Sequence, residues 1–235
     1  MKTVLFDLDG TLLPMDLNAF LHVYFQGLCS TIADIEPQLL KKSIYAGIDA
    51  MMRNDGKQTN RDAFGDVFAR VSGLDFLQNE NRFLEYYQNG FQNCVKACNT
   101  DAPSRELLDC LLAKGYRVGI ATNPIFPKVA TYSRLRWLGI DPEALELVTT
   151  YETSCFAKPN PDYYREVCAC MGVEPSDCIM IGNDVEEDGC AAQLGMPVML
   201  VTDCLLNLKS LPMDAFWSGT LSDVLQWAKD LPAAC

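Results

Sequence analysis

Short apolar runs alternate with helical patterns at the start of the chain and again from about residue 103 onward. The runs are four or five residues long and cover Thr3–Phe6, Arg117–Ala121, Leu145–Thr149, Cys178–Ile181 and Val198–Val201. Helical patterns separate most of them, over Ser104–Lys114, Pro127–Leu138, Pro161–Met171 and Val185–Leu194. Mostly apolar strands that are joined by helices are typical of a parallel sheet covered on both faces. The sequence therefore predicts an α/β fold built on a doubly wound parallel sheet.

The segment from residue 16 to residue 98 has a different texture, because its apolar residues recur at helical spacing and no strand pattern interrupts them. Four such sets begin at Leu17, Leu40, Phe64 and Leu84. Stretches with proline and polar residues, LLPMD and NTDAP, flank the segment as linkers. We predict a four-helix unit inserted after the first strand. The expected division is an α/β core domain of residues 1–15 and 100–235 and a helical cap domain of residues 16–99.

The composition argues against several classes of partner and location. The chain has 19 basic and 31 acidic residues, and its net charge of −12 disfavours nucleic acids and anionic membranes as partners. It contains no run of 18 apolar residues, and its N-terminal apolar run is too short for a signal peptide. We therefore expect a cytoplasmic protein whose 11 cysteines are reduced thiols. A single histidine and the lack of a CxxC pair argue against a zinc site.

Polar residues follow four of the predicted strands, closely after three of them and after a short loop in the case of the third. They are Asp7 after the first run, Thr122 and Asn123 after the second, Lys158 after the third, and Asn183, Asp184 and Asp188 after the fourth. Ligands of open parallel sheets bind beyond the carboxyl ends of the strands, at the topological switch point. Each motif is weak alone, but the four together predict one shared site.

In order and spacing, these motifs resemble those of the haloacid dehalogenase-like hydrolases, in the branch with a helical, C1-type cap after the first strand. DLDGT at residues 7–11 matches the first motif, Thr122 the second, Lys158 the third, and Asp184 with Asp188 the fourth. The resemblance spans the whole chain and implies the strand order 5-4-1-2-3. The dehalogenases lack the second aspartate of the first motif, which this chain keeps as Asp9. That residue indicates the phosphatase branch.

The resemblance implies a Mg²⁺-dependent phosphatase that acts on a small phosphorylated metabolite. Asp7 is the expected nucleophile, because a carboxylate that attacks phosphorus splits one difficult hydrolysis into two easier steps. Asp9 is the expected general acid and then general base. Thr122 and Lys158 complete the catalytic set, and the expected phosphate-binding residues are Gly10, Thr122, Asn123 and Lys158.

Mg²⁺ prefers oxygen ligands and usually retains water. The expected protein ligands are Asp7, the backbone carbonyl of Asp9, and Asp184 with Asp188. Since Asn183 stands where many relatives carry an acidic residue, the sequence leaves open whether Asp188 or Asn183 completes the metal shell.

Two alternative functions remain open on the sequence alone. A phosphotransferase or phosphomutase would use the same residues, whereas a binding protein on this fold would be free to lose Asp7 or Lys158. The single histidine, His22, lies in the predicted cap and is interpreted as a surface residue rather than a substrate contact. The aromatic residues Phe20, Tyr24 and Phe25 are candidates for the cap core or the wall of a lid. The substrate and the oligomeric state stay undetermined.

Overall fold

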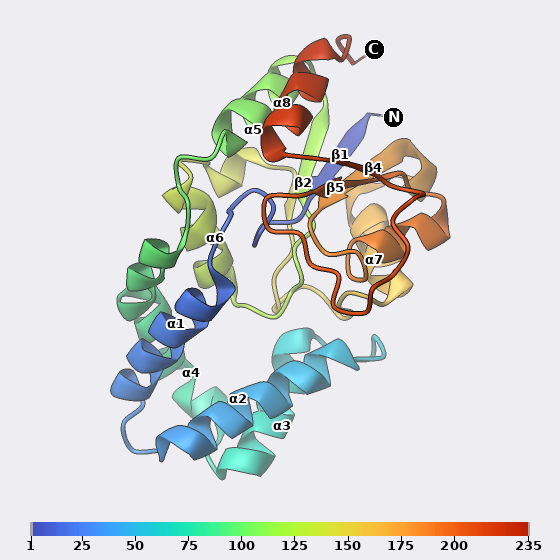
Figure 1. Ribbon diagram of the computed structural model, residues 1–235. Coiled ribbons are helices and arrows are strands. Elements are labelled where there is room, and N and C mark those ends of the chain that lie inside the picture. Colours follow the sequence, from blue (N-terminus) through green and yellow to red (C-terminus); the bar gives the residue numbers. More distant parts are fainter. Residues whose placement is uncertain (1, 235) are drawn as a thin grey trace.

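The computed structural model describes residues 2–234. One part of the molecule contains a sheet with the helices that pack on it, and a second part contains a separate group of helices (Figure 1). Within these residues, six parallel strands have the order β3-β2-β1-β4-β5-β6. They are β1 (Thr3–Phe6), β2 (Arg117–Ile120), β3 (Leu147–Val148), β4 (Cys178–Gly182), β5 (Val198–Val201) and β6 (Trp217–Gly219). The predicted fold class and the order of the first five strands are confirmed. The edge strand β6 was not predicted, because a three-residue, largely exposed strand leaves no apolar run in the sequence.

Alternate residues of the central strands face opposite sides of the sheet. Val4 and Phe6 pack in one cluster with the helices α5 (Ser104–Ala113), α6 (Lys128–Trp137) and α8 (Leu221–Asp230). Leu5 and Met180 pack in another with α7 (Pro161–Met171) and the 3₁₀ helix η4 (Gly189–Leu194). Short 3₁₀ turns, η2 (Pro142–Ala144) and η3 (Pro175–Asp177), precede β3 and β4. Both faces are thus covered, which explains why the central strands are mostly apolar.

One predicted helix is wrong in part. The pattern over Val185–Leu194 predicts a continuous helix, but the structure has turns followed by the 3₁₀ helix at Gly189–Leu194. Carboxylates replace main-chain partners here: Asp184 Oδ1 accepts the amides of Glu186 and Glu187 at 2.8 and 2.9 Å. Asp188 Oδ2 likewise accepts the amides of Asn183 and Asp184, each at 2.9 Å. Side chains that bond nearby amides compete with a regular helix.

The helical insertion contains α1 (Leu17–Thr31), α2 (Pro37–Met52), α3 (Asn60–Ser72), α4 (Phe76–Gln88) and the 3₁₀ helix η1 (Gly90–Ala97). Acidic or hydroxyl side chains cap the first four of these elements, each accepting the amide three residues later; they are Asp16, Glu36, Thr59 and Asp75. Such caps satisfy amides that a helix start leaves unpaired. The last apolar set, from Leu84 to Cys98, is divided between α4 and η1 because Asn89 and Gly90 are weak helix formers.

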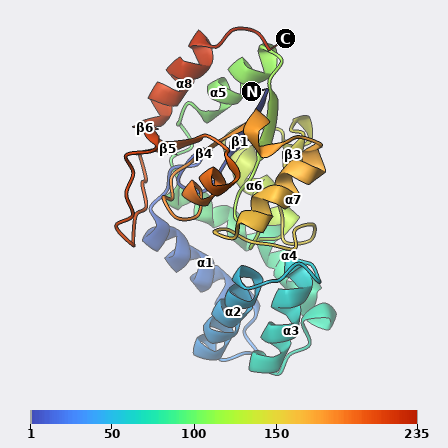
Figure 2. The ribbon, with the colours of Figure 1, turned by 90° about the vertical axis from the view of Figure 1, so that its right-hand side faces the viewer.

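The two linkers to the insertion run side by side. The amide of Asp16 donates to the carbonyl of Ala97 at 3.0 Å, and the amide of Asn99 donates to the carbonyl of Pro14 at 2.7 Å. This pairing holds the insertion at the end of the sheet where the strands finish (Figure 2). None of the described helices has the length and apolar character needed to cross a bilayer.

Candidate active site

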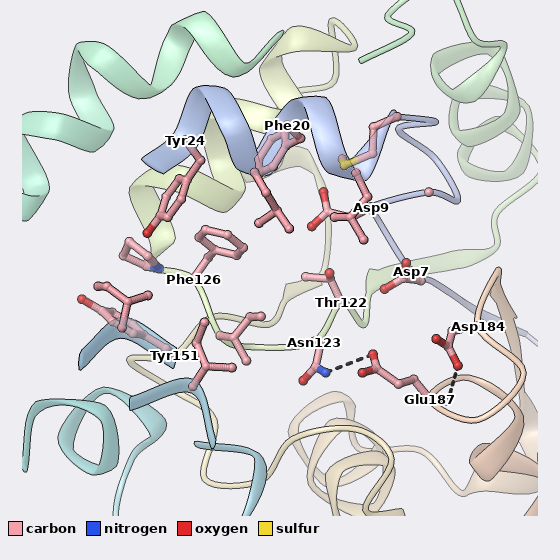
Figure 3. A pocket seen from close by; sticks show the side chains of 18 of the residues that line it. Asp7, Asp9, Phe20, Tyr24, Thr122, Asn123, Phe126, Tyr151, Asp184 and Glu187 are labelled. Carbon is pink, nitrogen blue, oxygen red and sulfur yellow. Dashed lines mark hydrogen bonds between the residues drawn. The ribbon is translucent and has the colours of Figure 1, made fainter. Parts of the chain in front are cut away.

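A cavity of about 300 Å³ lies between the carboxyl ends of the strands and the helical insertion. Its wall includes the sequence-predicted residues Asp7, Asp9, Gly10, Thr122, Asn123, Asp184 and Asp188. Figure 3 shows that Asp7, Asp184 and Glu187 lie at one end of this cavity, whereas Tyr24, Phe126 and Tyr151 lie at the other. Three of the four strand-end stretches therefore meet at a single rim.

Asp7 follows β1 directly, and its amide donates to the carbonyl of Ile181 at 2.9 Å, which continues the sheet by one residue. Its Oδ1 accepts a hydrogen bond from Lys158 Nζ at 3.0 Å, and its Oδ2 accepts one from Thr11 Oγ1 at 3.3 Å. Lys158 is fully buried and also donates to Asp188 Oδ1 at 2.6 Å. Lys158 does not face the open cavity itself but holds the Asp7 carboxylate at its rim.

The electrostatics of this cluster are dominated by burial. Burial raises the pKa of Asp7 to about 7, although Lys158 opposes the shift. Burial also raises the pKa of Glu187 to about 8 and that of Asp184 above its usual range. For Lys158, burial alone would lower the pKa, but the charges of Asp188 and Asp7 outweigh it and raise the pKa well above its usual range. Lys158 is therefore a permanent cation among carboxylates that are poorly solvated.

Asp188 and Asn183 are both committed to protein partners. Asp188 bonds Lys158 with one oxygen and two backbone amides with the other. Asn183 Oδ1 accepts from Thr11 Oγ1 at 2.9 Å, and its Nδ2 donates to the carbonyl of Cys204 at 2.8 Å. Asp184 differs, because the two amides that it accepts both go to Oδ1. Asp184 thus offers an oxygen for a ligand, whereas direct ligation by Asp188 or Asn183 would require these bonds to break.

Gly10 occupies a position that only glycine fits. Its φ is +84°, and a Cβ placed there would lie 2.4 Å from Asn183 Nδ2. The chain turns back at this point so that the loop after β1 passes directly against the loop after β4. The glycine therefore brings the first and fourth motifs into contact.

Two hydroxyl groups hold the backbone of the loop after β2. The carbonyl of Thr122 accepts from Thr149 Oγ1 at 2.7 Å and from the Tyr163 hydroxyl at 2.8 Å. Asn123 Nδ2 donates to Glu187 Oε2 at 3.0 Å, and its buried Oδ1 has no partner (Figure 3). These contacts fix the backbone and leave the two side chains at the cavity wall.

Asp9 forms an ion pair that the sequence did not reveal. Arg134, on α6 and only 1% exposed, contacts Asp9 Oδ2 through Nη1. Its other nitrogens donate to the Thr131 hydroxyl at 3.1 Å and to the carbonyl of Ala130 at 3.3 Å. The guanidinium also lies 4.4 Å from the centroid of the Phe126 ring. Asp9 Oδ1 is buried without a hydrogen-bond partner, so Arg134 holds one oxygen of Asp9 and leaves the other unsatisfied.

The residues at this end of the cavity suit a divalent cation. Among residues 2–234 there is no cluster of three or more His, Cys, Asp or Glu side chains that could hold a metal alone. Mg²⁺, however, is usually bound by one or two carboxylates together with other oxygens and water. Asp7 and Asp184 line the same rim, their pKa values are raised by burial, and a nearby positive charge would relieve the cost of ionising them.

Sequence reasoning missed two residues of the site. Glu187 lines the cavity beside Asp184, and its place in VEEDG was a usable signal. No sequence pattern pointed to Arg134, since its partner Asp9 lies 125 residues away in the chain. His22 is exposed on α1 and is not part of the cavity wall, which agrees with its interpretation as a surface residue. Phe20, Tyr24 and Phe25 belong to the buried core of the helical insertion, and they also line the cavity.

Comparison with known proteins identifies the family. The family model described as haloacid dehalogenase-like hydrolase matches residues 1–195. A glyceraldehyde 3-phosphate phosphatase of Methanothermobacter thermautotrophicus is 29% identical over 86% of this chain and 85% of its own length. A phosphoglycolate phosphatase of Rhodospirillum rubrum is 24% identical over 86% of this chain and 79% of its own.

The solved structures agree on the fold. An HAD phosphatase from Thermococcus onnurineus aligns over 100% of both chains with a TM-score of 0.62 and 20% identity. An L-2-haloacid dehalogenase from Xanthobacter autotrophicus aligns over 98% of this chain and 99% of its own, with a TM-score of 0.60 and 15% identity. With the family model covering most of its length and the site built at the switch point of the sheet, the chain belongs to the haloacid dehalogenase-like hydrolases.

Proposed function

We propose that this hydrolase is a Mg²⁺-dependent phosphatase that cleaves a small phosphate monoester through an aspartyl phosphate on Asp7. The observation that carries the proposal is the position of the Asp7 carboxylate. It stands at the cavity rim, held by Lys158 and Thr11, with Asp9 two residues further along the same loop. The phosphatases among the similar proteins support the same reaction class.

The reaction would proceed in two steps that use the same residues. One oxygen of Asp7 attacks phosphorus, the bond to the substrate alcohol breaks, and a proton bound at Asp9 Oδ1 passes to the leaving oxygen. A water molecule then attacks phosphorus, Asp9 takes its proton, and the bond to Asp7 breaks to release inorganic phosphate. Asp9 Oδ1 suits this exchange because Arg134 leaves it without a partner.

The phosphate charge needs stabilisation from the chain. Lys158 supplies a buried positive charge next to Asp7, and the Thr122 hydroxyl and the Asn123 amide lie at the wall where the phosphate oxygens would sit. Mg²⁺, held by the side chains of Asp7 and Asp184 and the backbone carbonyl of Asp9, would supply further charge stabilisation for the transferring group. Asp188, whose oxygens bond Lys158 and the backbone, would position these groups rather than bind the cation directly.

We further propose that residues 1–15 and 100–235 form the catalytic domain and residues 16–99 a cap that excludes water from it. The paired linkers support this division, because they provide one place at which the helical segment joins the sheet. Asn60 supports it too: the side-chain amide of this fully buried residue of α3 donates to the carbonyls of Pro124 at 3.2 Å and Phe156 at 3.0 Å. A cytoplasmic location belongs to the same proposal.

The test is hydrolysis of 4-nitrophenyl phosphate with and without Mg²⁺ by the natural protein and by Asp7→Asn. We expect activity that requires Mg²⁺ and falls by roughly 10³-fold or more in the variant, as when other enzymes lose a nucleophile. Mass spectrometry of the acid-quenched Asp9→Asn variant should show a phosphoryl group on the peptide that contains Asp7. Release of inorganic phosphate in equal amount to the alcohol distinguishes hydrolysis from transfer to another alcohol.

A matched control is Asp109→Asn, which changes an exposed carboxylate on α5 and should keep full activity. Equal activity of Asp7→Asn and the natural protein would overturn the mechanism, and activity that is indifferent to chelation would remove Mg²⁺ from it.

A further inference from the structure

We propose that the leaving group of the substrate is a small, uncharged aromatic ring system that occupies the part of the cavity enclosed by the helical insertion. This inference rests on the proposed phosphatase function and names its substrate class. It comes from the contrast between the two ends of the cavity, which differ in both charge and side-chain type (Figure 3).

The end of the cavity away from Asp7 is walled by aromatic rings from several elements. They come from α1, from α4 and from the loops after β2 and β3, and include Tyr24 with its hydrogen-bond partner Tyr87, Phe126 and Tyr151. Aliphatic side chains of the helical insertion, among them Leu21 and Ile48, also line the cavity. Aromatic side chains favour aromatic partners in edge-to-face or offset stacking, at a gain beyond the buried area alone.

Three of the tyrosine hydroxyls in the cavity wall, those of Tyr24, Tyr87 and Tyr151, are already engaged within the protein. The hydroxyls of Tyr24 and Tyr87 share a hydrogen bond of 2.8 Å. The Tyr151 hydroxyl donates to Glu80 Oε1 at 3.4 Å. The wall therefore presents ring surfaces to a ligand, and it makes few hydrogen bonds available to a sugar or other polyol.

The charges exclude a second anionic group on the substrate. No Lys, Arg or His of the described chain lines the cavity, whereas Asp7, Asp9, Asp184, Glu187 and Asp188 all do. The nearest buried cations are committed, because Lys158 pairs with two of these carboxylates and Arg134 pairs with Asp9. A carboxylate or second phosphate at the aromatic end would lose its hydration without gaining a partner.

The volume limits the size of the group. A cavity of about 300 Å³ is at the lower end of the range that holds small organic ligands, and the phosphate takes part of it. A single ring or a compact fused pair is the class that fills the remaining space. Such a group is also what an enclosed apolar wall binds most strongly, since burying it removes apolar surface from water.

The decisive experiment compares three primary alkyl phosphates, benzyl phosphate, ethyl phosphate and 2-phosphoglycolate, under one set of conditions. All three leave as primary alcohols, so differences in kcat/KM report the cavity more than intrinsic reactivity. We expect benzyl phosphate to exceed each of the other two by about 10- to 100-fold, the effect of burying a ring of this size. A kcat/KM for 2-phosphoglycolate or ethyl phosphate that equals or exceeds the value for benzyl phosphate would overturn the inference.

Two charge variants test the position of the group. Leu21→Lys on α1 and Ile48→Lys on α2 each place an ammonium in the part of the cavity wall that the helical insertion contributes, at residues that are only partly buried and so tolerate a longer side chain. We expect the ratio of kcat/KM for benzyl phosphate over 2-phosphoglycolate to fall by about 10-fold or more in at least one of them. The control Leu77→Lys changes a residue of α4 that is 64% exposed and outside the cavity wall, and should keep the natural ratio.

An unchanged ratio in both folded cavity variants would place the leaving group elsewhere and overturn the inference. The failure of the proposed function has a different signature: hydrolysis of 4-nitrophenyl phosphate that is absent, or that survives Asp7→Asn. That result would overturn both the phosphatase function and the aromatic leaving group. Asp7-dependent hydrolysis with the opposite preference among the three alkyl phosphates would overturn only the aromatic leaving group.

Discussion

Arg134 and Asp9 form an ion pair in which the arginine side chain is 1% exposed and the aspartate side chain 31% exposed. The arginine is fixed from three sides, by its bonds to Thr131 and Ala130 and by the Phe126 ring. Because these contacts fix the guanidinium, Arg134 determines where Asp9 Oδ2 lies. The other oxygen of Asp9, Oδ1, is left without a hydrogen-bond partner. The pair links the loop after β1 to α6, which also contacts the helical insertion through Trp137 and Gln92.

The first prediction concerns this pair. Arg134→Gln should lower kcat for an alkyl phosphate by about 10- to 100-fold, because Asp9 loses the contact that orients it for proton transfer. The loss should be smaller for 4-nitrophenyl phosphate, since a good leaving group needs little help from a general acid. We also expect a fall of ~1–3 kcal/mol in the free energy of unfolding, measured in urea.

Arg136→Gln is the matched control for Arg134, because Arg136 is exposed on the same helix and lies over Tyr132. Equal losses of kcat for good and poor leaving groups would argue that Arg134 has only a structural role.

The second prediction concerns Lys158, which is buried between Asp7 and Asp188. Lys158→Met leaves two buried carboxylates without a counter-charge and should lower the free energy of unfolding by about 3–5 kcal/mol. Adding Asp188→Asn should restore part of this stability without restoring activity, because the phosphate still lacks its cation. Lys57→Met, at an exposed position, provides the control. If Lys158→Met unfolds at the same urea concentration as the natural protein, the buried cluster is not held as described.

The third prediction concerns stability without metal. In metal-free protein, burial raises the pKa of Glu187 from 4.5 to about 8 and that of Asp7 from 3.8 to about 7. Across that interval the folded protein retains protons that the unfolded chain has released, so the free energy of unfolding falls as the pH rises. Thermal melts in a chelator should show a loss of at least about 1 kcal/mol between about pH 5 and pH 8. Added Mg²⁺ should recover stability most at the higher pH.

Glu187→Gln should flatten this pH dependence, whereas Glu174→Gln, at an exposed site, should leave it unchanged. A stability that rises over the same interval in the chelator would contradict the burial of these carboxylates.

The fourth prediction separates backbone strain from crowding at Gly10. Gly10→Ala and Gly73→Ala both place a Cβ on a residue with positive φ, +84° and +75° respectively. At Gly73 nothing lies within 4 Å of the new Cβ, so only the strain of about 1 kcal/mol is expected. At Gly10 the Asn183 amide must also move, so we expect a larger loss of stability together with a lower kcat. Identical effects at the two sites would show that the contact between the first and fourth motifs does not matter.

Much of the architecture could be predicted from the sequence because it depends on local patterns. The alternation of apolar runs with helical spacing predicted the sheet, and the apolar sets in residues 16–98 predicted the inserted helices. The pattern failed where side chains took over main-chain bonds, as after Asp184, and where an edge strand is too short to bury a run, as at Trp217–Gly219. The assignment of roles to Asp7, Asp9, Thr122, Lys158 and Asp184 remains a prediction that the experiments above address.

The fold class, the family and the loops that carry the polar residues could be predicted from the sequence, because they depend on short-range hydrophobic spacing and on the order of the motifs. Three features became visible in the folded protein alone: Lys158 joins Asp7 to Asp188, Arg134 holds Asp9, and the cavity has an aromatic, uncharged end. Each of these depends on residues that are far apart in the chain and that approach one another only when the strands pair and the helices close over their ends. Burial and electrostatic pairing are properties of that packing, so they cannot be predicted from a local sequence pattern.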